Sequence, residues 1–349
     1  MATAKNFTVT LLLPGLYGFT PQQWQEFIPH APMLPGLSAL LNRSRRTIKN
    51  PSSFESLLGT KFTLKGQTPL PVAALTYLHD KNQPPQHHVL RADPVCLKAD
   101  RDCLYFLGYG GLQVASEEAQ KLAEEINQIY VNDGWSLQIG AADRWYVCAE
   151  KKPLIETFPL TEVFGKNIAG YLPRGAEEKK WRIVLTELQM LLHSSEVNTQ
   201  RTMSQRLPIN SVWLWGEGEL PEHAAGHTYS FDCVWSNDAL CLGLAQWAQC
   251  KNEKLPHVAN EYFKQNNSGR HLIVFDDMRI LAKENFQSWI AKLEDFDEKW
   301  FTPLLEAFDK RCLSNINIEI ENGMVFEFAK QTIWNKWRHQ NRLWYEWFN

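Results

Sequence analysis

The sequence predicts an α/β fold in which a mostly parallel sheet is flanked by helices and a small β-hairpin lies near the C-terminus. Amphipathic helical segments such as 177–193 alternate along the chain with short apolar runs such as 211–215 (SVWLW). This alternation is typical of helices packed on a sheet. Two further apolar runs, 315–320 and 324–328, are separated by an Asn-Gly dipeptide at 322–323. That dipeptide favours the tight turn of a hairpin.

Two of the predicted strands end at residues of very different chemical character. Residues 8–13 (TVTLLL) run directly into Pro14, whereas residues 271–275 (HLIVF) run directly into Asp276 and Asp277. In open α/β sheets, ligand-binding chemistry gathers at the carboxyl ends of the strands. Asp276 and Asp277 are therefore candidate metal ligands, while the side chain of a proline has no atom that can ligate a metal.

The remaining elements follow from helix caps and from the spacing of apolar residues. We expect a helix at 116–130 with Ser116 as its N-cap, and a helix at 239–249 capped by Asp238. A long helical stretch is expected at about 284–309. Shorter elements are expected at 37–41 and 71–78, with strands at 145–148 and 229–235.

The composition is that of a globular protein. Of 349 residues, 44% are hydrophobic and 21% are charged, and the net charge of −3 does not by itself predict a nucleic-acid or membrane surface. We expect one domain over 1–349, and the segment at about 85–175 is a candidate for an inserted subdomain. The seven scattered cysteines form no CxxC pair and favour reduced thiols. Without a signal-peptide pattern or an apolar run of roughly 20 residues, the protein is expected to be cytoplasmic.

A dense group of charges lies between residues 91 and 102. The segment RADPVCLKADRD contains Arg91, Asp93, Asp100, Arg101 and Asp102. Arginine side chains could bind a phosphate-bearing ligand in a forked geometry. The same charges could instead satisfy one another in a salt-bridge network that stabilises a subdomain, and this second interpretation is favoured.

The C-terminal segment 330–349 interleaves cations with tryptophans. Such interleaving suits stacking on single-stranded nucleic acid, but it also suits a C-terminal segment packed on the body of the protein, which is favoured. No P-loop, dinucleotide fingerprint or GxSxG nucleophile elbow is present in the sequence.

Several segments together resemble a known family. PINSVWLWGEGE at 208–219, LGLA at 242–245 and the stretch 271–305, which includes LEDFD at 293–297, resemble segments of cofactor-independent phosphoglycerate mutases. With RADPVCLKADRD, the chain is most similar to a bacterial branch of related proteins, the RpfE-type regulatory proteins. The resemblance implies an alkaline-phosphatase-like α/β sandwich.

The chain departs from that family at the positions that would carry catalysis. The resemblance implies two divalent metals, usually manganese, and a serine that carries phosphate. The first strand of the family ends in a metal-ligand Asp, where this chain has Pro14, and the histidines expected after Asp277 are absent. The nucleophile is unassigned among four serines, which are Ser38, Ser44, Ser52 and Ser53.

Three functions follow as hypotheses. The leading one is a catalytically degenerate mutase relative, a pseudoenzyme with a binding or regulatory role toward an unknown protein partner or an anionic small molecule, and without a membrane partner. The second is an active mutase or metal-dependent phosphoesterase, in which Asp276 and Asp277 hold metal and Arg91 and Arg101 hold phosphate. The third is a single-stranded nucleic-acid-binding module at 330–349. No cofactor is predicted unless the metal site survives, in which case manganese or zinc is expected.

Overall fold

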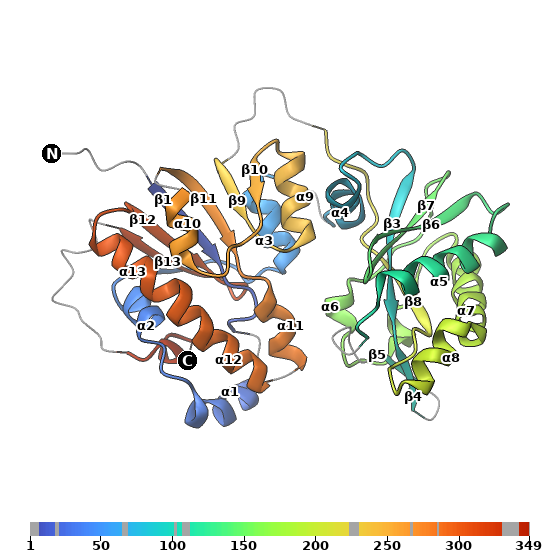
Figure 1. Cartoon of the computed structure of the whole chain (residues 1–349), viewed down its shortest axis with the longest axis horizontal. Coiled ribbons are helices and arrows are strands. Elements are labelled where there is room, and N and C mark those ends of the chain that lie inside the picture. The colour runs from blue at the N-terminus through green and yellow to red at the C-terminus, as the bar shows by residue number, and fades with distance from the viewer. Residues whose placement is uncertain are drawn as a thin grey trace. The chain divides into compact units, whose positions relative to one another are not determined.

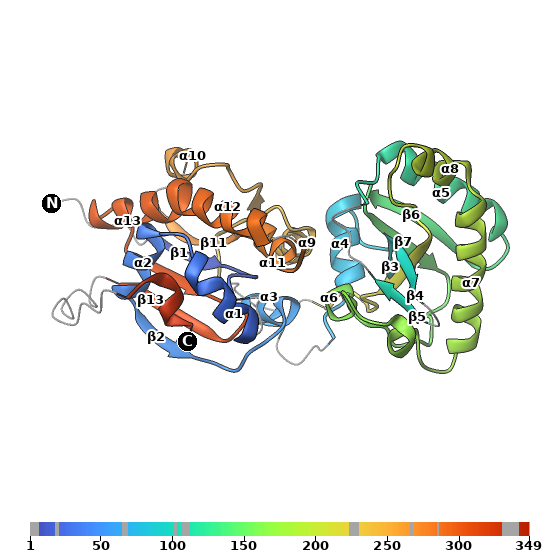
Figure 2. The same ribbon diagram turned by 90° about the horizontal axis from the view of Figure 1, so that it is seen from below.

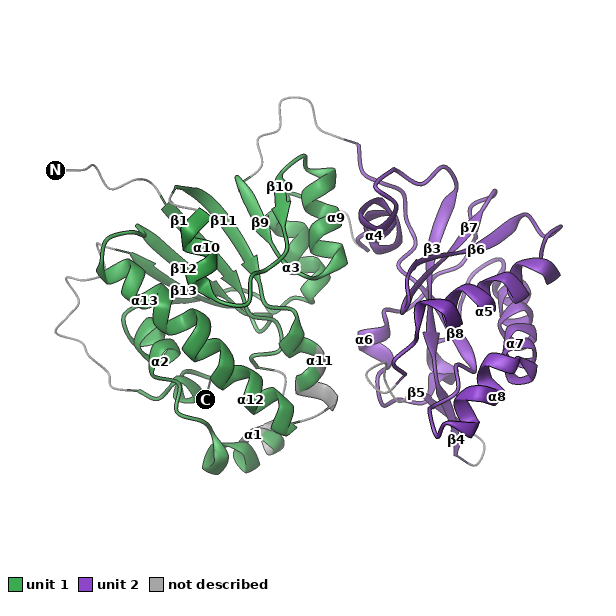
Figure 3. Ribbon diagram, in the orientation of Figure 1, with its two compact units in different colours: residues 1–66, 226–349 green, residues 67–225 purple. Residues whose placement is uncertain are grey.

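The chain forms two compact units, which are described separately here (Figure 3). Unit 1 consists of residues 1–66 and 226–349, and unit 2 consists of the intervening residues 67–225. The segment that leaves and rejoins unit 1 is therefore wider than the range of about 85–175 suggested by the sequence. The computed structural model describes residues 7–17, 21–64, 69–100, 103–106, 112–222, 230–265, 268–284, 286–329 and 342–348.

Unit 1 is built on a seven-stranded mixed sheet with the order β10-β9-β11-β1-β12-β13-β2 (Figure 1). The first five strands in this order are parallel, and the hairpin strand β13 pairs antiparallel with β12 on one side and with the edge strand β2 on the other. The predicted α/β fold with a mostly parallel sheet and a C-terminal hairpin is thus confirmed. The strands are β1 (Phe7–Leu12), β2 (Arg45–Ile48), β9 (Cys233–Trp235), β10 (Lys251–Glu253), β11 (Gly269–Val274), β12 (Asn315–Glu319) and β13 (Met324–Ala329).

Strand β1 lies in the interior of this sheet, and all of its residues except Thr8 are buried. It pairs in parallel with β11 on one side and with β12 on the other, so that Leu12 is level with both Val274 and Glu319. A nearly continuous apolar run suits a parallel strand that is covered on both faces. The carboxyl ends of β9, β11, β1 and β12 consequently lie at the same edge of the sheet.

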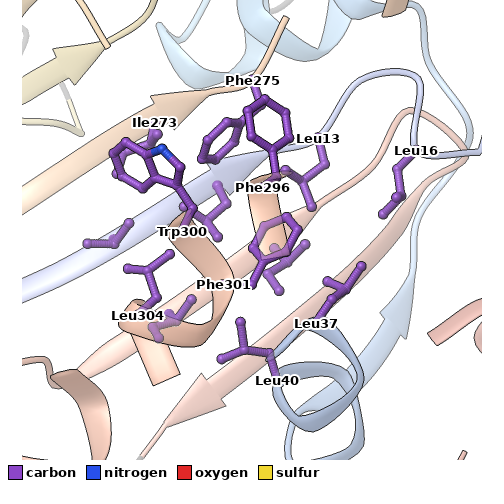
Figure 4. Close-up of a cluster of buried hydrophobic side chains, with 14 of the residues drawn as sticks. Leu13, Leu16, Leu37, Leu40, Ile273, Phe275, Phe296, Trp300, Phe301 and Leu304 are labelled. Carbon is purple, nitrogen blue, oxygen red and sulfur yellow. The ribbon is translucent and has the colours of Figure 1, made fainter. Parts of the chain in front are cut away.

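Helices α2, α12 and α13 pack on one face of the sheet and enclose an aromatic core (Figure 4). Trp300, Phe301 and Phe296 from the helical layer meet Phe275 and Ile273 from β11 and its end. Burial of such large side chains supplies most of the stability of this layer. The helices of unit 1 are α1 (Pro21–Phe27), η1 (Ile28–His30), α2 (Pro35–Asn42), α3 (Phe54–Lys61), α9 (Ala239–Trp247), α10 (Ala259–Gln265), α11 (Asp277–Glu284), α12 (Phe286–Phe296), η3 (Asp297–Phe301), α13 (Thr302–Asp309) and η5 (Trp344–Trp347).

The long helical stretch expected at 284–309 is interrupted by a π-helical turn. Helix α12 passes into α13 through η3, whose first residue, Asp297, is buried. The Asp297 carboxylate accepts hydrogen bonds from the backbone N–H groups of Gly36 and Leu37, at 3.0 and 2.7 Å. The turn therefore places an acid at the N-terminus of α2, where the orphan N–H groups need an acceptor.

Unit 2 has a four-stranded antiparallel sheet with the order β6-β7-β3-β8 (Figure 1). Figure 2 shows helices α5, α7 and α8 on one side of this sheet and α4 on the other. The alternation of β3 fits this arrangement, since Leu90 and Ala92 join the core under α5 and α7 while Val89 packs with α4. The elements are α4 (Val72–Lys81), β3 (His88–Val95), β4 (Leu97–Asp100), β5 (Cys103–Phe106), α5 (Ser116–Ile129), β6 (Trp135–Ala141), β7 (Arg144–Ala149), α6 (Leu160–Val163), η2 (Ile168–Tyr171), α7 (Glu178–Ser194), α8 (Glu196–Met203) and β8 (Ser211–Trp215).

Two sequence expectations about local structure are corrected. Ala115, and not Ser116, occupies the N-cap position of α5, and the Glu118 carboxylate accepts the Ala115 backbone N–H at 2.9 Å. The strand expected at 229–235 is limited to β9, and its expected first residue, Tyr229, lies outside the described residues. Asp238 caps α9 as predicted, accepting the Cys241 N–H at 2.8 Å. None of the helices in the described part of the chain is long and apolar enough to cross a membrane.

Candidate functional site

Acidic residues gather where β9 and β11 end, at one edge of the sheet of unit 1. Asp276 follows β11, and Asp238 follows β9, which is the neighbouring parallel strand. The Pro14 turn follows β1 on the other side of β11. Parallel register therefore brings the residues after these three strands together, as the sequence predicted for the strand ends.

Asp276 is partly buried, and its pKa is raised to about 7. Loss of hydration is the main cause, because burial disfavours the charged carboxylate. The nearby charges of Asp238 and Asp277 raise the pKa further, while Arg279 acts in the opposite direction. This carboxyl group therefore keeps its proton to a higher pH than an exposed aspartate does.

Asp277 faces a different environment from its neighbour. It is the first residue of α11, and its carboxylate lies 2.8 Å from the Lys292 ammonium group on α12. The side chain of Asp277 is 45% exposed. Of the two aspartates that the sequence offered as a pair of metal ligands, Asp277 is thus paired with a lysine, whereas Asp276 lies among the charges of Asp238, Asp277 and Arg279.

Arg279 is a cation close to Glu55 and Asp238, and the sequence did not single it out. Its Nη1 lies 3.2 Å from Glu55 Oε1, and its Nη2 lies 3.9 Å from Asp238 Oδ2. Its guanidinium carbon lies 4.3 Å from the centre of the Phe54 ring. The only sequence signal is its spacing in DDMR, one turn into the helix that follows Asp276. Its acidic partners come from distant parts of the chain.

The turn after β1 is packed tightly against the start of α11. Gly15 has φ of +83°, and a Cβ atom added there would lie 2.6 Å from the Arg279 Cα. The Gly15 N–H donates to Glu321 Oε2 at 3.1 Å, and its carbonyl accepts from Trp289 Nε1 at 3.0 Å. A glycine is required at this position both by the backbone conformation and by the close approach.

Three of the four serines considered as nucleophiles have side-chain hydrogen bonds in unit 1. Ser53 caps α3 by accepting the Ser56 N–H at 3.2 Å, and the Ser44 hydroxyl donates to the Leu40 carbonyl at 2.6 Å. The Ser38 hydroxyl accepts the Trp344 N–H at 3.2 Å. These contacts place Ser38 and Ser44 in α2 and its C-terminal cap rather than at the strand ends, so they do not resolve the nucleophile.

In unit 2, the RADP segment forms a closed ion pair on β3. Arg91 donates from Nε and Nη2 to the two oxygens of Asp93, at 2.9 and 2.8 Å, and Trp215 Nε1 donates to the same carboxylate at 2.7 Å. The Arg91 guanidinium lies 5.1 Å from the Trp215 ring and 5.8 Å from the Tyr146 ring. Burial raises the pKa of Asp93, and Arg91 opposes this shift.

The other charges of that segment are not brought to this ion pair. Asp100 is exposed at the end of β4, in the two-stranded sheet β4-β5. Arg101 and Asp102 lie outside the described residues. The geometry of Arg91 and Asp93 matches the salt-bridge interpretation, because each group satisfies the other.

A second buried network on β7 was not anticipated from the sequence. Arg144 donates from Nε and Nη2 to Asp80 on α4, both at 2.7 Å, and the Tyr146 hydroxyl donates to the same carboxylate at 2.6 Å. Hydrogen bonds and the charge of Arg144 hold the pKa of Asp80 below its usual value although burial acts in the opposite direction. These contacts join α4 to the sheet.

The described part of the C-terminal segment packs on unit 1. Trp344 is fully buried and donates from Nε1 to the Pro32 carbonyl at 2.9 Å. Trp347 donates to Asn42 Oδ1 at 3.1 Å and is covered by Arg342 at 5.1 Å. Residues 330–341, which carry the other cations and tryptophans of this segment, lie outside the described residues.

Comparison with known proteins gives this geometry a family context. The 2,3-bisphosphoglycerate-independent phosphoglycerate mutase of Methanosarcina barkeri is 30% identical over 116 residues, which are 33% of this chain and 29% of that enzyme. The probable enzyme of the same name from Geobacter sulfurreducens is 25% identical over 237 residues, or 63% of this chain and 59% of that protein. The chain is a distant homologue of the cofactor-independent phosphoglycerate mutases.

The mutase homologues are matched over less than two thirds of their own length, and no protein-family model matches the chain. The fold extends further than the sequence similarity. The structure of the PH0037 protein from Pyrococcus horikoshii superposes with a TM-score of 0.54 at 13% identity, covering 93% of this chain and 87% of that one. At this level of identity the superposition concerns the fold alone.

The two-metal centre implied by the mutase resemblance does not fit the described residues. No group of three or more His, Cys, Asp or Glu side chains is placed to hold a metal ion in the part of the chain that the structure describes. Pro14 replaces one expected ligand, Asp277 is engaged by Lys292, and Asp238 caps α9. The strand ends retain acids, but these acids have partners within the protein.

Proposed function

We propose that this mutase homologue is a catalytically degenerate protein with a binding or regulatory role. The observation that carries the proposal is that acids at the strand ends of unit 1 are paired with cations of the protein. Asp277 is paired with Lys292 at 2.8 Å, and Asp238 and Glu55 face Arg279. Two-metal phosphotransfer needs carboxylates that are available to the metals, and these carboxylates are paired with cations of the chain. A relation to RpfE-type regulatory proteins is part of the same proposal.

The binding role is supported by exposed apolar side chains on the helices of unit 2. Ile183 and Met190 lie two turns apart on α7 and are 58% and 70% exposed, and Ile129 at the end of α5 is 58% exposed. Exposed apolar side chains that share a helix face favour a protein partner over a small anion. A charged replacement there, Met190→Glu, is expected to preserve folding and weaken partner binding.

The competing function is an active mutase or metal-dependent phosphoesterase. What favours it is that the homologues at 25–30% identity carry the mutase name. In that case Asp276 and Asp277 would hold metal, and Arg91 and Arg101 would hold phosphate. We infer that this is the weaker of the two functions, because the Asp277 carboxylate is already paired with Lys292 at 2.8 Å.

One experiment separates these functions. Purified protein is assayed for interconversion of 2- and 3-phosphoglycerate, and for hydrolysis of a generic phosphomonoester, with and without manganese. The proposal expects no turnover above a metal-only blank and no stoichiometric metal by elemental analysis. Metal-dependent turnover that is lost in Asp277→Ala would establish the competing function instead, with Asp295→Ala as a control for an exposed acid paired to a lysine.

A further inference from the structure

The guanidinium group of Arg279 lies among the acids at the strand ends of unit 1. Arg279 contacts Glu55 at 3.2 Å and approaches Asp238 at 3.9 Å, and its side chain is 19% exposed. The two acids are 13% and 16% exposed. Asp276 lies close enough to interact with the charges of both Asp238 and Arg279. Carboxylates with so little access to water need a nearby positive charge.

We infer that Arg279 is a built-in counter-ion that takes over the charge-balancing role a divalent metal would have at these strand ends. The inference rests on the proposed function, in which the metal centre has been lost. It adds that Arg279 has replaced the positive charge of the metal. A fixed guanidinium balances the acids without any exogenous ion. Unit 1 should therefore fold and remain stable without metal.

The turn after β1 explains how Arg279 reaches this position. A Cβ at Gly15 would lie 2.6 Å from both the Arg279 Cα and the Met278 carbonyl oxygen. The Arg279 N–H also donates to the Asp276 carbonyl at 3.0 Å. Two features of the turn after β1 are thereby linked. Pro14 offers no ligand atom, and Gly15 has no side chain, which leaves room for the first turn of α11 with Arg279.

The surroundings of the guanidinium suit an arginine better than a metal ion. Its carbon lies 4.3 Å from the centre of the Phe54 ring, where the negative face of the ring attracts a weakly hydrated planar cation. A divalent metal prefers several oxygen ligands and retained water. On this side of Arg279 the structure presents a carbon surface.

The first test is a double-mutant cycle between Arg279 and Glu55. Arg279→Gln keeps a polar side chain but removes its charge, so it is expected to lower the melting temperature by about 3 °C or more. Adding Glu55→Gln removes the acid left without its cation, so the double variant is expected to melt above Arg279→Gln. Additive effects of the two substitutions would overturn the inference.

The second test uses metal ions as the probe. Wild-type protein is expected to melt at the same temperature in EDTA and in manganese. Arg279→Gln is expected to gain melting temperature when manganese is added, because the acids then lack an internal cation. Arg279→Lys keeps the charge and should stay insensitive to manganese, which provides a folded variant if Arg279→Gln proves unstable.

Arg43→Gln is the matched control. Arg43 also pairs with a carboxylate, Asp309, and also lies over an aromatic ring, Phe328, at 4.8 Å, but it is distant from the strand ends. The Arg43→Gln variant should be less stable than the wild type, and manganese should not change its melting temperature. A stoichiometric manganese response of the wild type would refute the inference. Turnover by a wild type whose Arg279 and Glu55 are still coupled would refute the proposed function alone.

Discussion

The carboxamide of Asn127 makes both of the hydrogen bonds that a neighbouring strand would make to Leu137. Asn127 Nδ2 donates to the Leu137 carbonyl at 2.9 Å, and its Oδ1 accepts the Leu137 N–H at 2.7 Å. Leu137 lies on β6, an edge strand of the sheet of unit 2. An unpaired edge is a template for pairing with another chain, and Asn127 covers part of that edge.

Asn127→Ala should therefore destabilise the protein and promote self-association. Loss of the two hydrogen bonds is expected to cost about 1–3 kcal/mol of unfolding free energy. Urea unfolding measures this loss, and light scattering at rising concentration measures association. Asn127→Asp, which keeps only the acceptor, should lie between the two proteins. An Asn127→Ala variant as stable and as monodisperse as the wild type would contradict this role.

Asp93 is expected to be required for stability because it neutralises Arg91 in the interior of unit 2. Asp93→Ala leaves a guanidinium that is 11% exposed without its acid, and the expected loss is about 3 kcal/mol. Removing both charges in Arg91→Leu with Asp93→Leu should recover part of this loss, as measured by urea unfolding. If the segment is instead a phosphate site, inorganic phosphate should raise the wild-type melting temperature, and the ion-pair interpretation would then fail.

Asp276 is expected to make the stability of unit 1 fall as the pH rises. Its pKa is about 7 in the folded protein and near 3.8 when unperturbed, so between these values the folded state holds a proton that the unfolded state releases. The stabilising effect is complete below about pH 3.8 and is lost as the pH rises through 7.

Asp276→Asn should accordingly be more stable than wild type above pH 7, by about 2 kcal/mol once its partial exposure is allowed for. The difference should vanish below about pH 3.8, and a series of urea titrations between about pH 3 and 9 measures it. Asp277→Asn is the control, since its exposed ion pair with Lys292 should contribute little. A pH-independent difference for Asp276→Asn would show that its carboxyl group does not titrate in this range.

His271 is expected to have the opposite pH dependence. Trp235 Nε1 can only donate, so its 3.3 Å contact makes His271 Nδ1 an acceptor, and the 2.8 Å contact then has the Tyr262 hydroxyl donating to the same atom. Burial lowers the pKa of His271 below 6.5, with Asp232 acting in the opposite direction and Lys251 adding to the decrease.

As the pH falls, the unfolded chain therefore binds a proton at His271 at a higher pH than the folded protein does. The contribution of neutral His271 is fully present above pH 6.5 and is lost as the pH falls below this value, by at most about 1.4 kcal/mol per pH unit. His271→Phe should flatten this part of the stability profile, while Tyr262→Phe should keep its slope. An unchanged slope in His271→Phe would assign the effect to another group.

The sequence was most informative where apolar runs and turn residues act locally. Strands β1 and β11 and the hairpin could be predicted because their side chains are buried or because Asn-Gly sets the turn. Strand β2, which reads RRTI, and strand β10, which reads KNE, lack that signal. They exist because a neighbouring strand pairs with them, and this cannot be read from a charged tripeptide or tetrapeptide.

The candidate site divides in the same way. Asp276 could be located from the sequence because it directly follows a strand, and Asp238 could be recognised as a helix cap. The contact of Arg279 with Glu55 joins residues 224 positions apart and follows from tertiary packing alone. The closed pair of Arg91 and Asp93 was one of two interpretations, and only the geometry of the forked bond distinguishes them.

The interrupted path of unit 1 has a consequence for the order in which the chain can fold during synthesis. Strand β1 pairs on both sides with β11 and β12, whose residues follow more than 250 positions later. Unit 2 is continuous from 67 to 225, so all of it emerges from the ribosome while β1 still lacks both neighbours. The apolar strand β1 must therefore remain unpaired in the nascent chain until the last third of the chain has been synthesised. The time needed to synthesise unit 2 is part of this delay.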